Sequence, residues 1–487
     1  MSKESYIKGD YIEITGGDNL TFAKGNITNS SIEGSFSQVG EKYGVSHNAA
    51  KLPPPMELDT KCVVFFGPKY QYRKYGFDYF VDEENNFEKL EEGYQKDILT
   101  GYKEEFTYDK WGKHSGGRNL TKEEAIERFQ HEYKRFVANM GNDKKYTYYV
   151  PYVTLFSQEF VTAYAKENPQ LEKDFALPYF EAELDIWIDV EEDEVGEYEW
   201  NYKKDLFSIS KINLPKTKTG KLTKLKETVT ITCLKDLDQD EEIKLYYKAK
   251  DDVLEKIAGK LIFLKNNNEV RKTEHIVFIK TLIKDTENSK DIKIEDNAQS
   301  ALRDALYQAF ILPKLEEVEY RLPLAERANF SANGAYFNKD NQLKLEEKSI
   351  EAGRKLRELF VKEKPSYEPS LLVFATLITP DKEGVKGYAI YGGRTIVFFP
   401  NALEYIYAHE VCHALDLQHT HFEDGENLDP NQPIETRRII PELKYVFEYG
   451  ATSNVMSYHI GQERSGKIVL WKWQWEIMNP KMKIKTK

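Results

Sequence analysis

The sequence predicts a multidomain α+β protein in which β-rich regions precede a C-terminal α/β domain. At 487 residues the chain is too long for one ordinary hydrophobic core, so about two to four domains are expected. Hydrophobic and polar residues alternate in the centre of the chain, as in strands with one buried face. From about residue 297 the hydrophobic residues recur with a helical period, and buried strands are interspersed with these helices.

The composition narrows the range of functions. Charged residues make up 31% and hydrophobic residues 40% of the chain, which is typical of a folded globular protein. A net charge of −12 argues against nucleic acid and anionic membranes as main partners. The longest apolar runs, such as 371–378, fit buried strands and are too short to span a membrane. We therefore expect no nucleic-acid partner and no membrane span.

Changes in these patterns divide the chain into five parts. The predicted parts are a small β-rich N-terminal module at 1–50, a proline-rich linker at 51–56, a mixed α/β region at 57–175, a β-sandwich at 176–292 and the C-terminal domain at 293–487. The linker contains Pro53, Pro54 and Pro55, and consecutive prolines form a stiff extended spacer. In the mixed region, Thr121 and Glu124 form a capping-box pattern that predicts the start of a helix.

Several short strands separated by polar turns predict an immunoglobulin-like sandwich between residues 176 and 292. The clearest strand has apolar residues at every second position: Ala182, Leu184, Ile186, Ile188 and Val190. The mainly polar residues between them predict one buried and one mainly solvent-exposed face. Further strands are expected at 229–233, 243–249, 259–264 and 275–283. Such a domain is usually a spacer or a binding module, and no residues in it point to chemistry.

Helices and strands are mixed in the C-terminal domain. The expected elements are an amphipathic helix at 345–360, a buried strand at 371–378 and two short strands within 387–399 around a Gly-Gly turn. Asn401 and Glu404 form a second capping-box pattern, so a helix is expected from about residue 402 to residue 415. This helix carries the residues that point most clearly to a function.

The segment from His409 to His419 contains the pattern His-Glu-x-x-His. His409 and His413 are four residues apart, so on a helix they lie on the same face and can hold two corners of a zinc tetrahedron. Glu410 is turned away from coordination but stays near the metal, where a metallohydrolase places its general base. The alternative is that both histidines belong to the core and bond to backbone carbonyls; a second feature downstream argues against it.

The second feature is the segment 453–458, Ser-Asn-Val-Met-Ser-Tyr. Together the two segments resemble the metzincin clan of zinc endopeptidases, in which an extended HExxHxxGxxH helix is followed by a methionine turn. The resemblance implies a metzincin-like α/β zinc peptidase domain. Matched position by position, it implies that His409, His413 and His419 bind Zn²⁺, that Glu410 is the general base, that Met456 lies under the metal site and that Tyr458 lies near the zinc. It also implies that an edge strand before this helix, within 387–399, pairs with the substrate backbone.

One position departs from the family pattern, since Asp416 stands where the family has glycine. Aspartate tolerates a left-handed backbone conformation better than most residues, so the chain can still turn sharply at this position. The departure leaves His421 as a competing third ligand beside His419.

The three cysteines, Cys62, Cys233 and Cys412, are far apart and form no CxxC pair, so we expect no disulfide framework. Cys412 lies between the two histidines of the helix but on another face, and we expect it to be a small buried apolar residue. An alternative is that Cys62 or Cys233 caps the zinc in a latent form, although neither has a supporting motif.

The resemblance to metzincins implies a zinc-dependent endopeptidase that acts on a protein or peptide substrate. Glu410 would take a proton from a water activated by the zinc, and Tyr458 would hydrogen-bond the developing oxyanion. One alternative is a gluzincin-type peptidase with Glu435 or Glu442 as the third ligand. The other is a non-catalytic secreted adaptor or binding protein, in which the zinc is structural.

The N-terminus has no apolar segment typical of a secretory signal peptide. The domain order and a local likeness at 258–261, Ala-Gly-Lys-Leu, resemble modular effectors of bacterial type VI secretion. This second, weaker resemblance implies export without a signal peptide and contact with a secretion machinery. A cytoplasmic location is the alternative.

Overall fold

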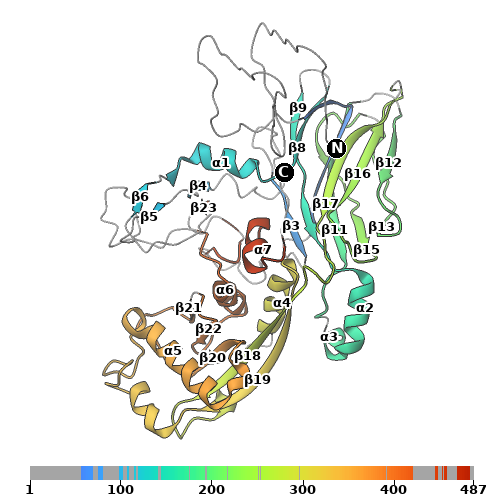
Figure 1. Cartoon of the computed structure of the whole chain (residues 1–487). Coiled ribbons are helices and arrows are strands. Elements are labelled where there is room, and N and C mark those ends of the chain that lie inside the picture. The colour runs from blue at the N-terminus through green and yellow to red at the C-terminus, as the bar shows by residue number, and fades with distance from the viewer. Residues whose placement is uncertain are drawn as a thin grey trace, which may run out of the picture. The chain divides into compact units, whose positions relative to one another are not determined.

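The computed structural model describes residues 56–69, 75–80, 98–102, 107–108, 114–116, 119–140, 144–174, 176–191, 195–216, 218–250, 252, 254–294, 297–390, 392–420, 445–447, 452, 454–457 and 469–482. These residues form a mixed α+β protein with several sheets, which confirms the general fold class predicted from the sequence (Figure 1). The predicted N-terminal module and all but the last residue of the predicted linker lie outside the described residues.

Two sheets, which we call the sandwich, share one hydrophobic core. The first has the strand order β12-β16-β17-β10-β3, formed by Glu197–Asn201, Glu241–Lys248, Lys256–Phe263, Tyr152–Thr154 and Gly76–Asp78. The second has the order β13-β15-β11-β14 with β2 also paired to β11, formed by Phe207–Ile209, Val229–Cys233, Glu181–Val190, Thr223–Lys224 and Cys62–Pro68. Alternate residues of β11, from Ala182 to Val190, are fully buried in the shared core, as the sequence pattern predicts.

The second face of β11 is less exposed than the sequence predicts. Asp189 on this face has no exposed surface. Its carboxylate forms a salt bridge with Lys144 and accepts hydrogen bonds from the hydroxyls of Tyr146 and Thr219. Tyr146 belongs to β9 (Lys145–Tyr149), so strands distant in sequence cover a face that alternation alone marks as solvent-exposed.

One strand expected in the sandwich belongs to another sheet. The segment predicted at 275–283 forms most of β18 (Lys272–Leu282), which pairs in parallel with β19 and β20 of the C-terminal sheet. Its residues from Ile276 to Ile279 are all fully buried, which is typical of a central parallel strand covered on both faces. The assignment of this strand was therefore wrong, whereas the predicted domain limits stay predictions because strand pairing alone does not define folding units.

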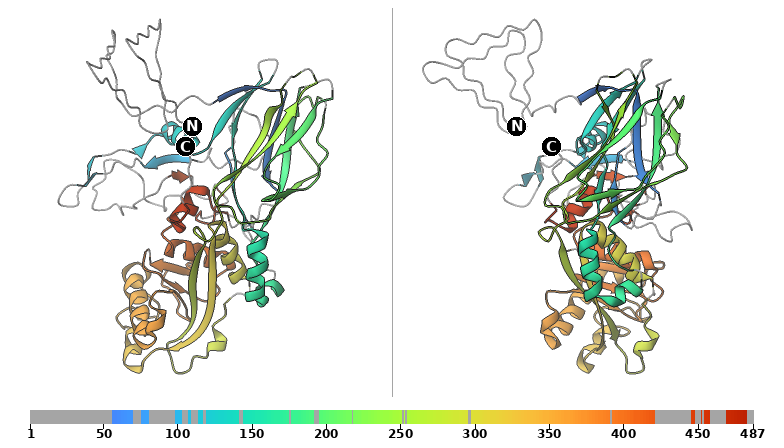
Figure 2. Two further views of the ribbon diagram at one scale, coloured as in Figure 1. Left: turned by 45° about the vertical axis from the view of Figure 1, so that its right-hand side comes forward. Right: turned by 90° about the vertical axis from the view of Figure 1, so that its right-hand side faces the viewer.

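The C-terminal sheet has the order β19-β18-β20-β22-β21. Besides β18 it contains Ile311–Arg321, Leu371–Ala375, Thr395–Phe398 and the edge strand Gly387–Ile390. Four strands run parallel, and β21 at the edge runs antiparallel to β22. Residues of α5 (Leu345–Glu363) pack on one face of the sheet, and residues of α4 (Ala298–Gln308) and α6 (Glu404–Ala414) pack on the other. Figure 2 shows the long strands β18 and β19 side by side.

The remaining elements are short. They are the sheet β1-β8-β9 (Met56–Asp59, Arg135–Asn139 and β9), the sheet β23-β4-β7 (Tyr445–Phe447, Ile98–Tyr102 and Asn119–Leu120), the pair β5-β6 (Thr107–Tyr108 and His114–Gly116), the helices α1 (Lys122–Gln130), α2 (Gln158–Glu167), α3 (Pro169–Lys173) and α7 (Lys472–Met478), and the 3₁₀ helices Ser289–Asp291, Leu324–Phe330 and Pro365–Tyr367. The capping box predicted at Thr121 and Glu124 is present at the start of α1. Among the helices that the structure describes, none has the length and apolar character needed to cross a bilayer.

Candidate metal centre

Helix α6 carries His409 and His413 one turn apart, as the sequence predicts, but it begins later than expected. It starts at Glu404 rather than near residue 402, and no side chain caps its N-terminus. Asn401 has a φ of 61°, which is left-handed. An N-cap residue normally has an extended backbone, so Asn401 cannot act as the cap and this part of the prediction was wrong.

The chain leaves α6 through a left-handed turn at Asp416. The φ of Asp416 is 72°. The N–H of Asp416 donates to the carbonyl of His413 at 3.1 Å, and the N–H of Leu417 donates to the carbonyl of Cys412 at 3.0 Å. This is the Schellman arrangement, which usually has glycine at the left-handed position. Aspartate therefore occupies the glycine position without loss of the sharp turn, and the chain comes back to His419.

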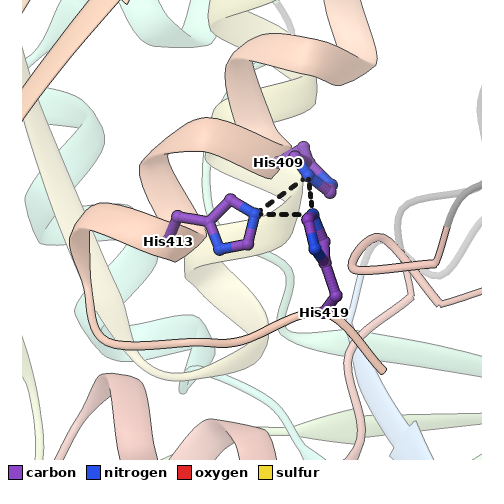
Figure 3. A group of neighbouring side chains, drawn as sticks. All are labelled: His409, His413 and His419. Carbon is purple, nitrogen blue, oxygen red and sulfur yellow. Dashed lines mark hydrogen bonds between the residues drawn. The ribbon is translucent and has the colours of Figure 1, made fainter. Parts of the chain in front are cut away.

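The turn brings three histidines together (Figure 3). The Nε2 atom of His413 lies 3.0 Å from that of His409 and 2.9 Å from that of His419, and the Nε2 atoms of His409 and His419 are 3.1 Å apart. Three nitrogens at a tetrahedral metal would be about 3.3 Å apart at zinc–nitrogen distances of about 2.0–2.1 Å. The cluster is therefore close to the size that a single metal ion requires.

The outer nitrogens of two rings face backbone carbonyls. His409 Nδ1 lies 2.8 Å from the carbonyl oxygen of Val455, and His413 Nδ1 lies 2.7 Å from that of Leu417. A carbonyl only accepts hydrogen bonds, so each Nδ1 carries the proton and each Nε2 of a neutral ring keeps its lone pair. Lone pairs that converge at this distance repel one another unless a cation lies between them. The donor set therefore fits a metal ion.

Backbone carbonyls of Val455 and Met456 interact with residues in and next to the histidine cluster. Met456 is fully buried, and its carbonyl accepts a hydrogen bond at 3.1 Å from the N–H of Thr420, the residue after His419. Tyr458 and His421 lie outside the described residues, as do Glu435 and Glu442. The structure thus brings together His409, His413 and His419 beside Met456, and the predicted position of Tyr458 stays a prediction.

Glu410 points toward the edge strand. Burial raises the pKa of its carboxyl to about 8, and a hydrogen bond with the backbone of Ala389 in β21 lowers that pKa in part. A cation at the three histidines would also favour the charged form of this carboxyl. The residue next to the first histidine therefore lies against the strand at the edge of the sheet.

All three cysteines are buried thiols. Cys62 and Cys233 lie in the sandwich core, where burial raises the pKa of each thiol to about 12. Cys412 is buried on α6, and burial raises its pKa as well. The metal-sized group of donors found within the described part of the chain contains histidines alone, so Cys412 fits the expectation of a buried apolar residue.

Sequence reasoning gave no role to Asn454, Val455 or Gln474, although all three belong to the surroundings of the cluster. Asn454 lies within the motif 453–458, and Gln474 lies on α7 between two buried tryptophans. No pattern in the sequence links an asparagine to a glutamine twenty residues later. Only the tertiary contact reveals the pair.

Comparisons with known proteins add little. No family model and no curated protein matches the chain. Among solved structures, a Bacteroides ovatus GH5 xyloglucanase in complex with a XXXG heptasaccharide is 11% identical, with a TM-score of 0.11. The match covers 47% of this chain and 56% of that one. A TM-score this low carries no argument about fold or function. The fold and the site thus define an α+β protein with three histidines that can hold a metal ion.

Proposed function

We propose that the chain is a zinc-dependent endopeptidase of the metzincin type. The convergence of the three Nε2 atoms within 3.1 Å of one another is the observation that carries this proposal. Histidine-rich tetrahedral sites are typical of zinc, and three protein ligands leave a position for water or substrate. Two further features support the metzincin assignment. The chain makes a left-handed turn at Asp416, where the family has glycine. The carbonyl of Met456 accepts a hydrogen bond from the N–H of Thr420, which joins the methionine segment to the residue after His419.

In this proposal, His409, His413 and His419 would hold a zinc ion, which would act as a Lewis acid and lower the pKa of a water molecule. Glu410 takes the proton that the attacking water releases and delivers it to the leaving amine. Tyr458 donates a hydrogen bond to the oxyanion that develops on the substrate. The buried position of Glu410 excludes bulk water from its carboxyl, which strengthens its interaction with charges in the site.

We also propose that the C-terminal sheet with its helices is a metzincin-like domain and that the sandwich is immunoglobulin-like. A metzincin-like domain is supported by the edge strand β21, which runs antiparallel to β22 shortly before α6 and can pair with an extended substrate. An immunoglobulin-like sandwich is supported by the two sheets that share one core. Export in the manner of type VI secretion effectors is part of this proposal and rests on sequence resemblance alone.

Two alternatives are less well supported. In a gluzincin-type peptidase a glutamate from a later helix would be the third ligand, but the Nε2 of His419 already lies 2.9 Å from that of His413. In a non-catalytic adaptor the zinc would be structural and would need no base. Burial of the Glu410 carboxyl disfavours its charged form, and such a cost is typical of functional sites rather than of structural ones.

Zinc analysis combined with cleavage of a peptide library tests the proposal. The purified protein should contain about one equivalent of zinc and cleave peptides. A chelator should remove both the zinc and the activity, and added zinc should restore them. Zinc-loaded protein that cleaves no peptide in the library would favour the adaptor alternative.

A further inference from the structure

A pair of buried side-chain amides connects helix α7 to the methionine turn. Asn454 Nδ2 donates to Gln474 Oε1 at 2.7 Å, and Gln474 Nε2 donates back to Asn454 Oδ1 at 3.1 Å. Both residues have no exposed surface. Gln474 Oε1 also accepts a hydrogen bond at 2.9 Å from the N–H of Trp471, so the glutamine is fixed to its own helix. The two amides therefore form one rigid unit.

This unit sets the orientation of the peptide group between Val455 and Met456. The N–H of Met456 donates to Asn454 Oδ1 at 2.9 Å. The carbonyl of Val455, in the same planar peptide group, faces His409 Nδ1 at 2.8 Å. Because the peptide group is planar, a bond that fixes its N–H also fixes the direction of its carbonyl. Asn454 thus holds one side of this plane, and His409 contacts the other.

The backbone around this peptide group is held as well. The N–H of Val455 donates to the carbonyl of Val469 at 2.9 Å, and the N–H of Ser457 donates to the carbonyl of Asn454 at 3.0 Å. These bonds anchor the turn but leave the tilt of the Val455 carbonyl to be set by the contact at Met456. The amide pair supplies that contact.

We infer that Asn454 and Gln474 are positioning residues that fix His409 for metal binding through the Val455–Met456 peptide group. The inference rests on the proposed metal site and names two residues that support it without touching the metal. A hydrogen bond to the outer nitrogen of a ligating histidine sets its tautomer and orientation, and loss of such a bond typically costs about 10–100-fold in metal affinity. The amide pair acts one step further out and preserves that bond.

Two substitutions test the inference. Gln474→Met and Asn454→Leu keep the approximate size of each side chain but remove its hydrogen bonds. Each should weaken zinc binding by about 10-fold or more, measured by competition with a chelator at a temperature where all variants are folded. The double variant should lose little more than either single variant, because the two residues act as one unit.

Gln308 provides a matched control. It is also a fully buried glutamine, and its Oε1 accepts a hydrogen bond at 3.0 Å from the N–H of Leu470, the residue before Trp471. Gln308→Met should lower the melting temperature but leave zinc affinity within about 2-fold of wild type. The visible spectrum of the cobalt-substituted protein should change in Gln474→Met and Asn454→Leu but not in Gln308→Met, since it reports the geometry of the ligands.

Wild-type zinc affinity and an unchanged cobalt spectrum in both Gln474→Met and Asn454→Leu would overturn the inference. An equal loss of affinity in Gln308→Met would also overturn it, because the effect would then be general destabilisation. If the wild type binds zinc but cleaves nothing, and the two variants lose affinity, the inference stands and the proposed peptidase fails. If the wild type cleaves peptides and the variants keep full zinc affinity, the proposed peptidase stands and the inference fails. A wild type that binds no metal would refute both.

Discussion

The sandwich and the surroundings of α6 both bury polar side chains, but they satisfy them in different ways. In the sandwich, the buried carboxylate of Asp189 is bonded by Lys144, Tyr146 and Thr219, all from the chain itself. At α6 and the turn that follows it, the Nε2 atoms of His409, His413 and His419 lie within 3.1 Å of one another, and burial raises the pKa of Glu410. The buried carboxylate of Asp189 is therefore satisfied within the fold, whereas the three histidines form a group that can hold a metal ion.

The largest expected effect is the loss of bound zinc when a histidine of α6 is removed. His409→Ala or His413→Ala should abolish stoichiometric zinc binding, because two ligands cannot close a tetrahedral site. The sandwich should stay folded in both variants, because its hydrophobic core contains neither His409 nor His413. Metal analysis after gel filtration measures the effect. Full zinc retention in either variant would contradict the account of α6.

A second pair of substitutions tests whether His419 or His421 is the third ligand. His419→Ala should lose most zinc affinity, because its Nε2 lies 2.9 Å from that of His413. His421→Ala should lose little. Zinc titration of the two variants side by side measures the difference, and the opposite order would mean that the turn at Asp416 leads to a different ligand.

A substitution in the sandwich should affect stability without affecting metal. Asp189→Ala removes the acceptor of Tyr146 and Thr219 and the charge partner of Lys144. Leaving the buried hydroxyl of Tyr146 without an acceptor costs about 1–3 kcal/mol of unfolding free energy. Denaturant unfolding measures the loss, and zinc content should stay at the wild-type level. Loss of zinc in this variant would show that the two regions are energetically coupled.

The smallest expected effect concerns the left-handed turn at Asp416, which lies between His413 and His419. Asp416→Gly should stabilise or leave unchanged the left-handed turn, because glycine adopts a φ of 72° without steric cost. Asp416→Val should destabilise the turn by about 1–2 kcal/mol and weaken zinc binding. Thermal melts with and without zinc compare the pair. Equal behaviour of the two variants would mean that backbone strain at this position does not control the site.

Local patterns predicted a good part of the fold and of the site. Alternation along β11 predicted the five apolar residues that are buried in the sandwich core, and the capping box at Thr121 predicted the start of α1. The spacing of His409 and His413 identified the site because both lie on one helix. These features depend on residues that are close in the sequence.

The failures have a different physical cause, since they depend on distant neighbours. β18 was assigned to the wrong sheet because a short apolar run does not reveal which strands pair with it. Asp189 was expected to be exposed, but Lys144 and Tyr146 cover it. The Asn454–Gln474 pair could not be foreseen, because its members meet only when α7 packs on the methionine turn.

The most direct test of the proposed peptidase compares Glu410→Gln with the wild type. The substitution keeps the size and polarity of the side chain but removes the basic oxygen. A neutral amide is also compatible with burial, so zinc content and melting temperature should stay close to wild type. Peptide cleavage should fall by about 10²–10⁴-fold, which is the usual contribution of a general base. Equal rates of cleavage by the two zinc-loaded proteins would contradict the assignment of Glu410 and place the activity elsewhere.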